Sequence, residues 1–136
     1  MLYLVKQVEQ AIRAHLDDLL RPLGLTLNQY TALSVLERRD DLTSAELARR
    51  SFVRPQTMQE MITSLDERGF IERHRDPANR RVLLIRLTPK GRAMLEKYDE
   101  QVQLLQDRML ATLTARQRQN LRDALTACRR SLATRN

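Results

Sequence analysis

Residues 43–69, TSAELARRSFVRPQTMQEMITSLDERG, are the most informative part of the sequence, because they hold two short helical patterns separated by a tight turn. The second pattern begins at Arg54-Pro55. Proline is favourable at the first helical position, because the N–H that it lacks would have no hydrogen-bond acceptor within the helix. Its apolar residues recur at helical spacing, at Met58, Met61, Ile62 and Leu65. Gly69 suits a left-handed cap at the end of that helix. The stretch therefore predicts a helix, a tight turn and a second helix.

The pattern changes after Gly69. Residues 70–75 and 82–87 are strand-like, and residues 76–81 between them are rich in turn formers. This arrangement predicts a β-hairpin with a projecting polar tip that carries Arg80 and Arg81. We expect Asp76 to stabilise the turn through an ion pair with one arginine while the other faces outward, and the sequence does not assign which.

Helical patterns flank this centre on both sides. The first ends near Pro22, and another starts at Thr88-Pro89 and carries an apolar stripe to Leu113, about 25 residues. Three Thr-x-x-Glu/Gln capping boxes mark helix starts: Thr26 with Gln29, Thr43 with Glu46, and Thr114 with Gln117. A helix as long as the one after Pro89 rarely packs only on its own small domain. The prediction is a mainly α fold with one small hairpin, the fold class of a winged helix-turn-helix with long terminal helices.

The charge of the chain is concentrated in its middle. The 136 residues, a usual size for one domain, include 24 Lys and Arg against 17 Asp and Glu, a net charge of +7. Residues 49–92 hold 11 basic and 5 acidic side chains and so contribute +6 of that total. Such a balance favours a polyanionic partner. The alternative is a solvated basic surface that serves solubility, and only the positions of the charges decide between the two.

Several classes of function are disfavoured by the composition. The one cysteine, Cys128, excludes an intramolecular disulfide and a four-thiolate zinc site, and neither His15 nor His74 has a His or Cys neighbour at ligand spacing. We find no phosphate loop, nucleophile elbow or zincin motif, so we expect neither an enzyme nor a cofactor. No apolar run approaches the ~20 residues that cross a bilayer. We therefore expect a cytoplasmic protein without a membrane partner.

The second short helix carries side chains that suit base recognition. In a helix-turn-helix, the second helix enters the major groove, which is about 12 Å wide, and its first residues meet the base edges. Gln can pair with adenine, Arg with guanine, and the methyl of Thr with that of thymine. The candidate DNA-binding residues are Arg54, Pro55, Gln56, Thr57 and Gln59 in the helix, with Arg75, Asn79, Arg80 and Arg81 in the hairpin. The alternatives are that Arg54 contacts only phosphate and that Thr57 is an ordinary exposed residue.

Three segments resemble the MarR family of transcriptional regulators. Asp76-Pro77-Ala78-Asn79-Arg80-Arg81 followed by Leu87-Thr88-Pro89-Lys90-Gly91 is similar to the wing signature of that family, and 42–48 and 65–71 are similar to the segments that flank its recognition helix. The resemblance implies a homodimer that binds a pseudo-palindromic operator in double-stranded DNA, favouring a repressor. It implies one domain over 1–136, with the DNA-binding part at 26–87 and dimerisation helices at 1–22 and 88–136.

The resemblance also implies a small aromatic or amphipathic effector, bound between the dimer helices and the winged part. The apolar residues near that junction, Tyr30, Leu33 and Met94, are better explained as core. Oxidant-sensing members use a cysteine near the start of the chain, where this sequence has none, and we expect Cys128 to lie buried as a small hydrophobe. The competing interpretation is a winged-helix protein-interaction module whose basic face takes an acidic protein.

Overall fold

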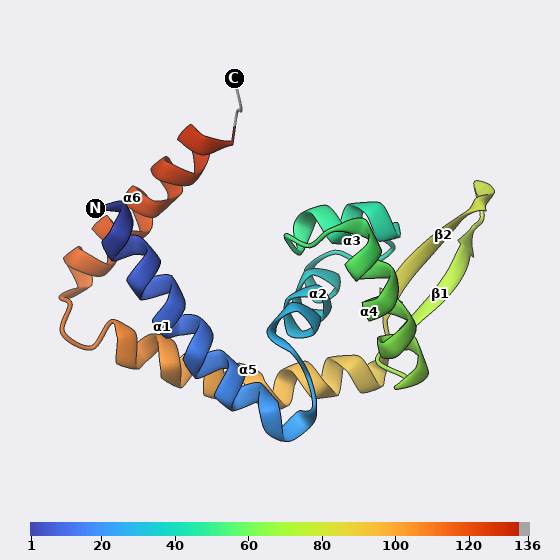
Figure 1. Cartoon of the computed structure of the whole chain (residues 1–136), viewed down its shortest axis with the longest axis horizontal. Helices are drawn as coiled ribbons and strands as arrows, with labels where there is room; N and C mark the ends of the chain where they lie inside the picture. The colour runs from blue at the N-terminus through green and yellow to red at the C-terminus, as the bar shows by residue number, and fades with distance from the viewer. Residues whose placement is uncertain (134–136) are drawn as a thin grey trace. The chain divides into compact units, whose positions relative to one another are not determined.

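A computed structural model describes residues 1–133 as helices and one two-stranded antiparallel hairpin (Figure 1). The elements are α1 (Leu2–Leu20), a 3-10 turn (Arg21–Leu23), α2 (Leu27–Arg38), α3 (Ser44–Arg50), α4 (Pro55–Glu67), β1 (Ile71–Asp76), β2 (Asn79–Leu87), α5 (Pro89–Met109) and α6 (Ala115–Leu132). This confirms the predicted fold class. The chain divides into two compact units, Met1–Val102 and Gln103–Asn136, and the last three residues of the predicted 88–136 segment lie outside the described residues.

All three predicted capping boxes form and begin helices where expected. The backbone N–H of Gln29 donates to Thr26 Oγ1 over 3.1 Å, that of Glu46 to Thr43 Oγ1 over 3.2 Å, and that of Gln117 to Thr114 Oγ1 over 3.2 Å. In each box the Glu or Gln side chain bonds back to the threonine N–H. Free N–H groups at a helix start are thus satisfied locally, which explains why sequence alone located these three starts.

The first unit contains one hydrophobic core, built from the middle of the chain. Most of its buried members come from α2, α3, α4, the hairpin and the first turns of α5, for example Leu33, Leu47, Met58, Ile85 and Leu95. Tyr30 and Met94 are partly buried and pack against this core, and burial raises the pKa of the Tyr30 hydroxyl. The prediction that Tyr30, Leu33 and Met94 belong to the core is therefore confirmed.

The hairpin is attached to the core at the end away from its turn. Leu42, in the segment between α2 and α3, pairs with Ile85 of β2 and extends the sheet by one bridge. Where α5 begins, Thr88 accepts a hydrogen bond from the N–H of Gly91, and a Cβ on Gly91 would lie 2.2 Å from the carbonyl oxygen of Phe70. Only glycine lets α5 approach the start of the hairpin so closely.

Helix α1 contrasts with that core because it buries little of its apolar surface. Leu20, its last residue, is its one buried residue among those described, and its first turns expose large apolar side chains. Tyr3 is 76% exposed and Val5 is 50% exposed. An exposed apolar stripe of this kind is typical of an interaction surface.

The second unit holds the end of α5, a short loop and α6. The side chain of Arg118 donates to the carbonyl oxygens of Leu110 and Leu113 and so fastens the loop to α6. The predicted stripe to Leu113 is therefore too long: the helix ends at Met109, because a new capping box begins at Thr114. The prediction that Cys128 is buried is also wrong for the single chain, since no residue of α6 is buried and Cys128 is exposed.

Candidate nucleic-acid interface

Helices α3 and α4 are joined by a short turn of defined geometry. The N–H of Ser51 donates to the carbonyl oxygen of Leu47 over 2.9 Å, and the N–H of Val53 donates to that of Ala48 over 3.1 Å. Ser51 is buried, whereas Phe52 is exposed and has a positive φ of 60°. Buried apolar side chains of both helices, Leu47 and Met58 among them, pack in the core below the turn. The turn therefore holds α4 at a fixed angle to α3.

The first turn of α4 presents the predicted recognition residues to solvent. Arg54, Pro55, Gln56, Thr57 and Gln59 are all exposed, and Met58 between them is buried. Gln59 donates from Nε2 to Ser44 Oγ over 3.0 Å and so contacts the start of α3. The others keep their polar groups free of hydrogen bonds to described side chains. This end of α4 thus offers guanidinium, amide and hydroxyl groups on a rigid element.

The hairpin, from here on the wing, projects away from the three helices α2, α3 and α4 (Figure 1). Its strands pair in register from Ile71 with Leu87 as far as Arg75 with Leu83, and a bulge then brings Asp76 opposite Asn79. The predicted six-residue loop is therefore too long, because β2 already begins at Asn79. Arg80 and Arg81 lie in β2 beside the turn and not at its tip, which is Pro77-Ala78.

Local hydrogen bonds hold the turn of the wing. Asp76 Oδ1 accepts from the N–H of Ala78 over 2.9 Å, Asn79 Oδ1 accepts from the N–H of Arg81 over 3.2 Å, and Arg75 Nη1 donates to the carbonyl oxygen of Arg80 over 2.9 Å. Within residues 1–133, Asp76 makes no ion pair with Arg80 or Arg81. The expected Asp76–arginine pair is thus replaced by a backbone bond, which short Asp side chains favour in turns.

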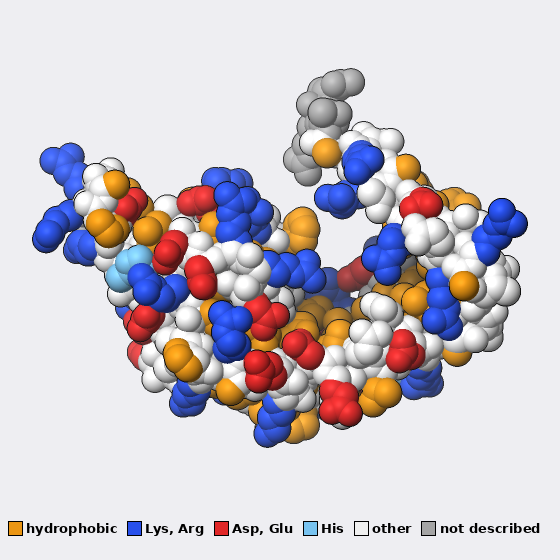
Figure 2. Space-filling model, turned by 180° about the vertical axis from the view of Figure 1, so that it is seen from behind, with side chains coloured by type: hydrophobic (Ala, Val, Ile, Leu, Met, Phe, Trp, Pro, Cys, Tyr) orange, Lys and Arg blue, Asp and Glu red, His pale blue; other side chains and the backbone are white. Residues whose placement is uncertain are grey.

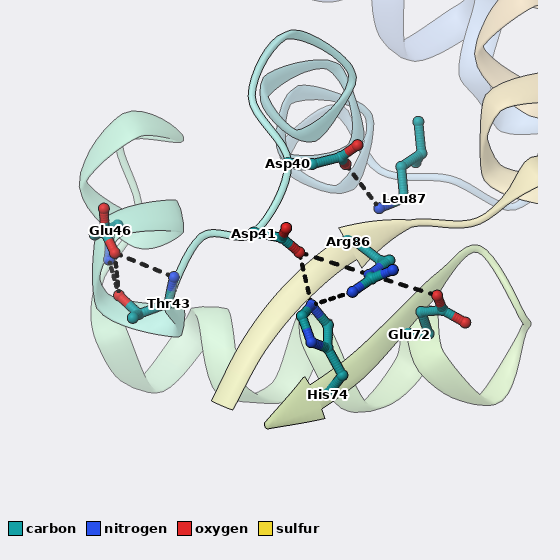
Figure 3. A network of polar contacts seen from close by, with 8 residues as sticks. All are labelled: Asp40, Asp41, Thr43, Glu46, Glu72, His74, Arg86 and Leu87. Atoms are coloured by element: carbon teal, nitrogen blue, oxygen red, sulfur yellow. Dashed lines mark hydrogen bonds and ion pairs between the residues drawn. The ribbon is translucent and has the colours of Figure 1, made fainter. Parts of the chain in front are cut away.

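A polar cluster fixes the base of the wing to the segment between α2 and α3 (Figure 3). Asp41 Oδ1 lies 2.6 Å from His74 Nε2, and Arg86 Nη2 lies 2.8 Å from the same nitrogen. Arg86 Nε lies 3.6 Å from a carboxylate oxygen of Asp41 and 3.6 Å from one of Glu72. No local sequence pattern predicts this cluster, because Asp41 and His74 are 33 residues apart in the chain.

The basic side chains of residues 49–92 fall into two groups. Some are engaged within the fold: Arg68 donates to the carbonyl oxygens of Leu23 and Gly24, Arg73 pairs with Asp66 at 2.8 Å, Arg86 belongs to the wing cluster, and Lys90 donates to the carbonyl oxygen of Arg68. The side chains of Arg49, Arg50, Arg54, Arg80 and Arg81 make no hydrogen bond or ion pair with another described residue. Figure 2 shows Lys and Arg side chains gathered at its left end, where the wing lies.

The elements around this surface define a winged helix-turn-helix: a short helix, a turn, an exposed second helix and a basic two-stranded wing directly after it. Its sequence matches the profile of the MarR family over residues 23–82. The HTH-type transcriptional repressor Rv2887 of Mycobacterium tuberculosis is 35% identical over 123 residues, which are 90% of this chain and 88% of that protein. The chain belongs to the MarR family.

Solved structures of Rv2887 are similar to most of this chain. Its complex with DNA aligns with a TM-score of 0.77 at 32% identity and covers 94% of this chain and 96% of that one. Its complex with p-aminosalicylic acid aligns with a TM-score of 0.77 at 33% identity and covers 94% and 97%. Because the MarR family consists of transcriptional regulators, the prediction that this chain is not an enzyme is confirmed. Every helix within residues 1–133 is too short or too polar to span a membrane.

Proposed function

We propose that this protein is a sequence-specific DNA-binding repressor that acts in the cytoplasm as a homodimer on a pseudo-palindromic operator. The observation that carries the proposal is the exposed first turn of α4, where Gln56 and Thr57 are free to meet base edges and Arg54 is free to bind phosphate. Arg80 and Arg81 of the wing, which have no ion-pair partner among the described residues, also lie within the basic segment 49–92. They would contact the DNA phosphate backbone or enter the adjacent minor groove. Rv2887, which has this fold, binds DNA.

The proposed DNA contacts divide by chemistry. Gln56, Thr57 and Gln59 are uncharged and would read bases, with Pro55 supporting the first turn of the helix. Arg54, Arg75, Arg80 and Arg81 carry fixed positive charge and would neutralise phosphates or feel the potential of a narrow groove. Asn79 and Asp76 shape the turn that presents these arginines.

The domain division is part of the same proposal. Residues 26–87 form the DNA-binding part, and 1–22 with 88–136 form the dimerisation helices of a single domain. The exposed apolar residues of α1 and α6 support it, among them Tyr3, Val5 and Leu125. Two copies that cover these residues would place two α4 helices for half-sites about one DNA turn apart. An aromatic carboxylate is the effector class we propose, because Rv2887 binds p-aminosalicylic acid and salicylic acid.

Binding to genomic DNA fragments from the upstream region of its own gene tests the proposal. Purified parent protein should bind one fragment saturably, and the affinity should fall steeply with salt as phosphate contacts release counterions. Gln56→Ala should relax the choice of fragment, costing about 1–3 kcal/mol for the cognate sequence. Arg81→Ala should weaken binding to all fragments. It should also reduce the salt slope, which is the slope of log affinity against log salt concentration, by about 1.

Matched variants separate the proposed site from the rest of the basic surface. Arg73→Ala removes a positive charge that is already paired with Asp66, so it should change the salt slope less than Arg81→Ala does. If Gln56→Ala and Arg81→Ala both bind specific and random DNA as the parent does, the site is wrong. Capture of one acidic protein, with no preference among DNA sequences, would instead support the protein-interaction module.

A further inference from the structure

Phe52 is an unexplained residue in the turn between α3 and α4. Its side chain is 92% exposed, although phenylalanine is among the most apolar side chains. Its backbone has a φ of 60°, in the left-handed region that disfavours any residue with a Cβ. The hydrophobic effect and the backbone both count against phenylalanine here, and neither cost is offset by packing within the described chain.

The turn requires the left-handed conformation but does not require an aromatic side chain. The chain must reverse between the bonds of Ser51 to Leu47 and of Val53 to Ala48, and Phe52 is the residue at which it does so. Glycine or asparagine meets such a requirement at less cost than a large apolar residue. Residues held in disfavoured conformations cluster at binding sites, where the displayed side chain has a use.

The charges around Phe52 indicate what kind of partner it would contact. Arg49 and Arg50 precede it at the end of α3, Arg54 follows it at the start of α4, and all three are exposed and free of described side-chain partners. An occupant of this surface must therefore be anionic and must also offer an apolar face. A DNA strand has both, since each phosphate is flanked by deoxyribose rings and each base has an apolar face or methyl group.

We propose that Phe52 is a DNA-contacting residue that packs against the deoxyribose and base edge of the strand whose phosphates Arg49, Arg50 and Arg54 bind. This inference rests on the proposed function. It assigns to the turn a contact that is apolar and therefore adds no counterion release. The arginines around it supply the salt-dependent part of the affinity, and Phe52 supplies a part that salt does not screen.

Three substitutions in the full-length protein test the proposal: Phe52→Gly, Phe52→Asn and Phe52→Tyr. The probe is the DNA fragment that the parent selects from its upstream region, with a random fragment of equal length beside it. Phe52→Gly and Phe52→Asn should bind the selected fragment about five- to tenfold more weakly, as expected for loss of a partly buried aromatic side chain. Phe52→Tyr keeps the ring and should bind within about twofold of the parent.

Two further measurements separate this contact from a structural effect. Phe52→Gly relieves the strained backbone and should raise the melting temperature by a few degrees while it weakens DNA binding. Loss of affinity together with gain of stability is a combination that a merely structural residue does not give. The slope of affinity against salt should stay that of the parent in Phe52→Gly, whereas Arg54→Ala should reduce it by about 1.

Other results would overturn the inference. If Phe52→Gly binds the fragment as tightly as the parent while Arg54→Ala and Arg81→Ala are weakened, Phe52 contacts no DNA and the proposed function stands. If the parent itself shows no preference for any fragment, the proposed function and the inference about Phe52 are both wrong. If Phe52→Gly weakens self-association in sedimentation equilibrium instead of DNA affinity, a second copy of the chain covers the residue.

Discussion

Helices α4 and α6 have comparable amphipathic sequences but bury very different amounts of them. Helix α4 buries Met58, Met61, Ile62 and Leu65, and these residues meet the core formed by α2, α3 and the wing. Helix α6 repeats leucines at positions 121, 125 and 132, and all three are exposed, as Leu125 is at 52%. The same periodicity thus completes a core in the first unit, whereas within the described residues of the second unit it leaves an exposed apolar stripe.

This difference in burial indicates that the winged part and the terminal helices are stabilised in different ways. The winged part has its own core and its own polar anchors, so its shape is independent of other molecules. In the proposed homodimer, the terminal helices would gain comparable stabilisation by burying their apolar stripes against a second copy. Four substitutions, whose expected effects decrease from Leu65→Ala through Gly91→Ala and Leu125→Ala to Thr43→Ala, test this contrast.

The largest effect is expected from truncation of the winged core. Leu65→Ala removes a side chain with no exposed surface, and such deletions cost about 2–5 kcal/mol of unfolding free energy because a cavity remains. Urea unfolding followed by circular dichroism measures the loss, which should be the same at low and high protein concentration. A loss below about 1 kcal/mol would mean that α4 is not part of a tightly packed core.

A close backbone contact comes next. In Gly91→Ala, the new methyl group would lie 2.2 Å from the carbonyl oxygen of Phe70 and 2.7 Å from a methyl carbon of Leu87, so α5 must shift. Overpacking of this kind costs about 1–3 kcal/mol in thermal or urea unfolding. The control is Arg92→Ala, because Arg92 follows Gly91 in the chain and its side chain is exposed. It should change the free energy of unfolding by less than about 0.5 kcal/mol. An unchanged melting temperature in Gly91→Ala would contradict the close approach.

The third substitution tests the exposed stripe of α6. Leu125→Ala should raise the dimer dissociation constant about 5- to 30-fold, corresponding to about 1–2 kcal/mol of lost apolar burial. Sedimentation equilibrium measures this constant, and the stability of the winged part should not change. Asp123→Ala, on the opposite face of the same helix, should leave the dimer intact. Equal effects of the two substitutions would show that this stripe is not an interface.

The smallest effect is expected at a helix start and depends on pH. Thr43→Ala removes a cap and should cost about 1 kcal/mol at neutral pH. The side-chain and backbone hydrogen bonds from Thr43 lower the pKa of Glu46 below its ordinary value of 4.5. This part of the stabilisation is therefore present above pH 4.5 and is lost as the pH falls through the depressed pKa.

A second capping box supplies the control for that pH dependence. Thr114→Ala breaks the same motif in α6, where the partner Gln117 does not titrate. The difference in stability between the parent and Thr43→Ala should therefore shrink in acid, whereas the difference for Thr114→Ala should remain constant. Acid titration of unfolding in the three proteins compares them directly. If the free energy of unfolding depends on pH in the same way in both variants as in the parent, the charge of Glu46 adds nothing to the cap.

Residues that act through their near neighbours were predicted well from sequence. The capping boxes, the proline at the start of α4 and the left-handed Gly69, with a φ of 79°, form within a few residues of one another. The exposed face of α4 follows from the same periodicity that buries Met58 and Ile62. The length of the wing turn was predicted less well from sequence. The turn-forming composition of residues 76–81 predicted a six-residue loop, whereas strand pairing extends to Asn79 and leaves a shorter turn.

Local sequence patterns were enough to predict the order of helices, the helix-turn-helix, the basic wing and the resemblance to a family of regulators, because each depends on residues close together in the chain. The tertiary structure was needed to show which arginines are engaged in the fold and which remain free, and to show that Asp41, His74 and Arg86 meet at the base of the wing. It also revealed the strained, exposed Phe52. These features depend on contacts between segments far apart in the chain, or on a backbone angle that tertiary packing imposes, and no periodicity records either of them.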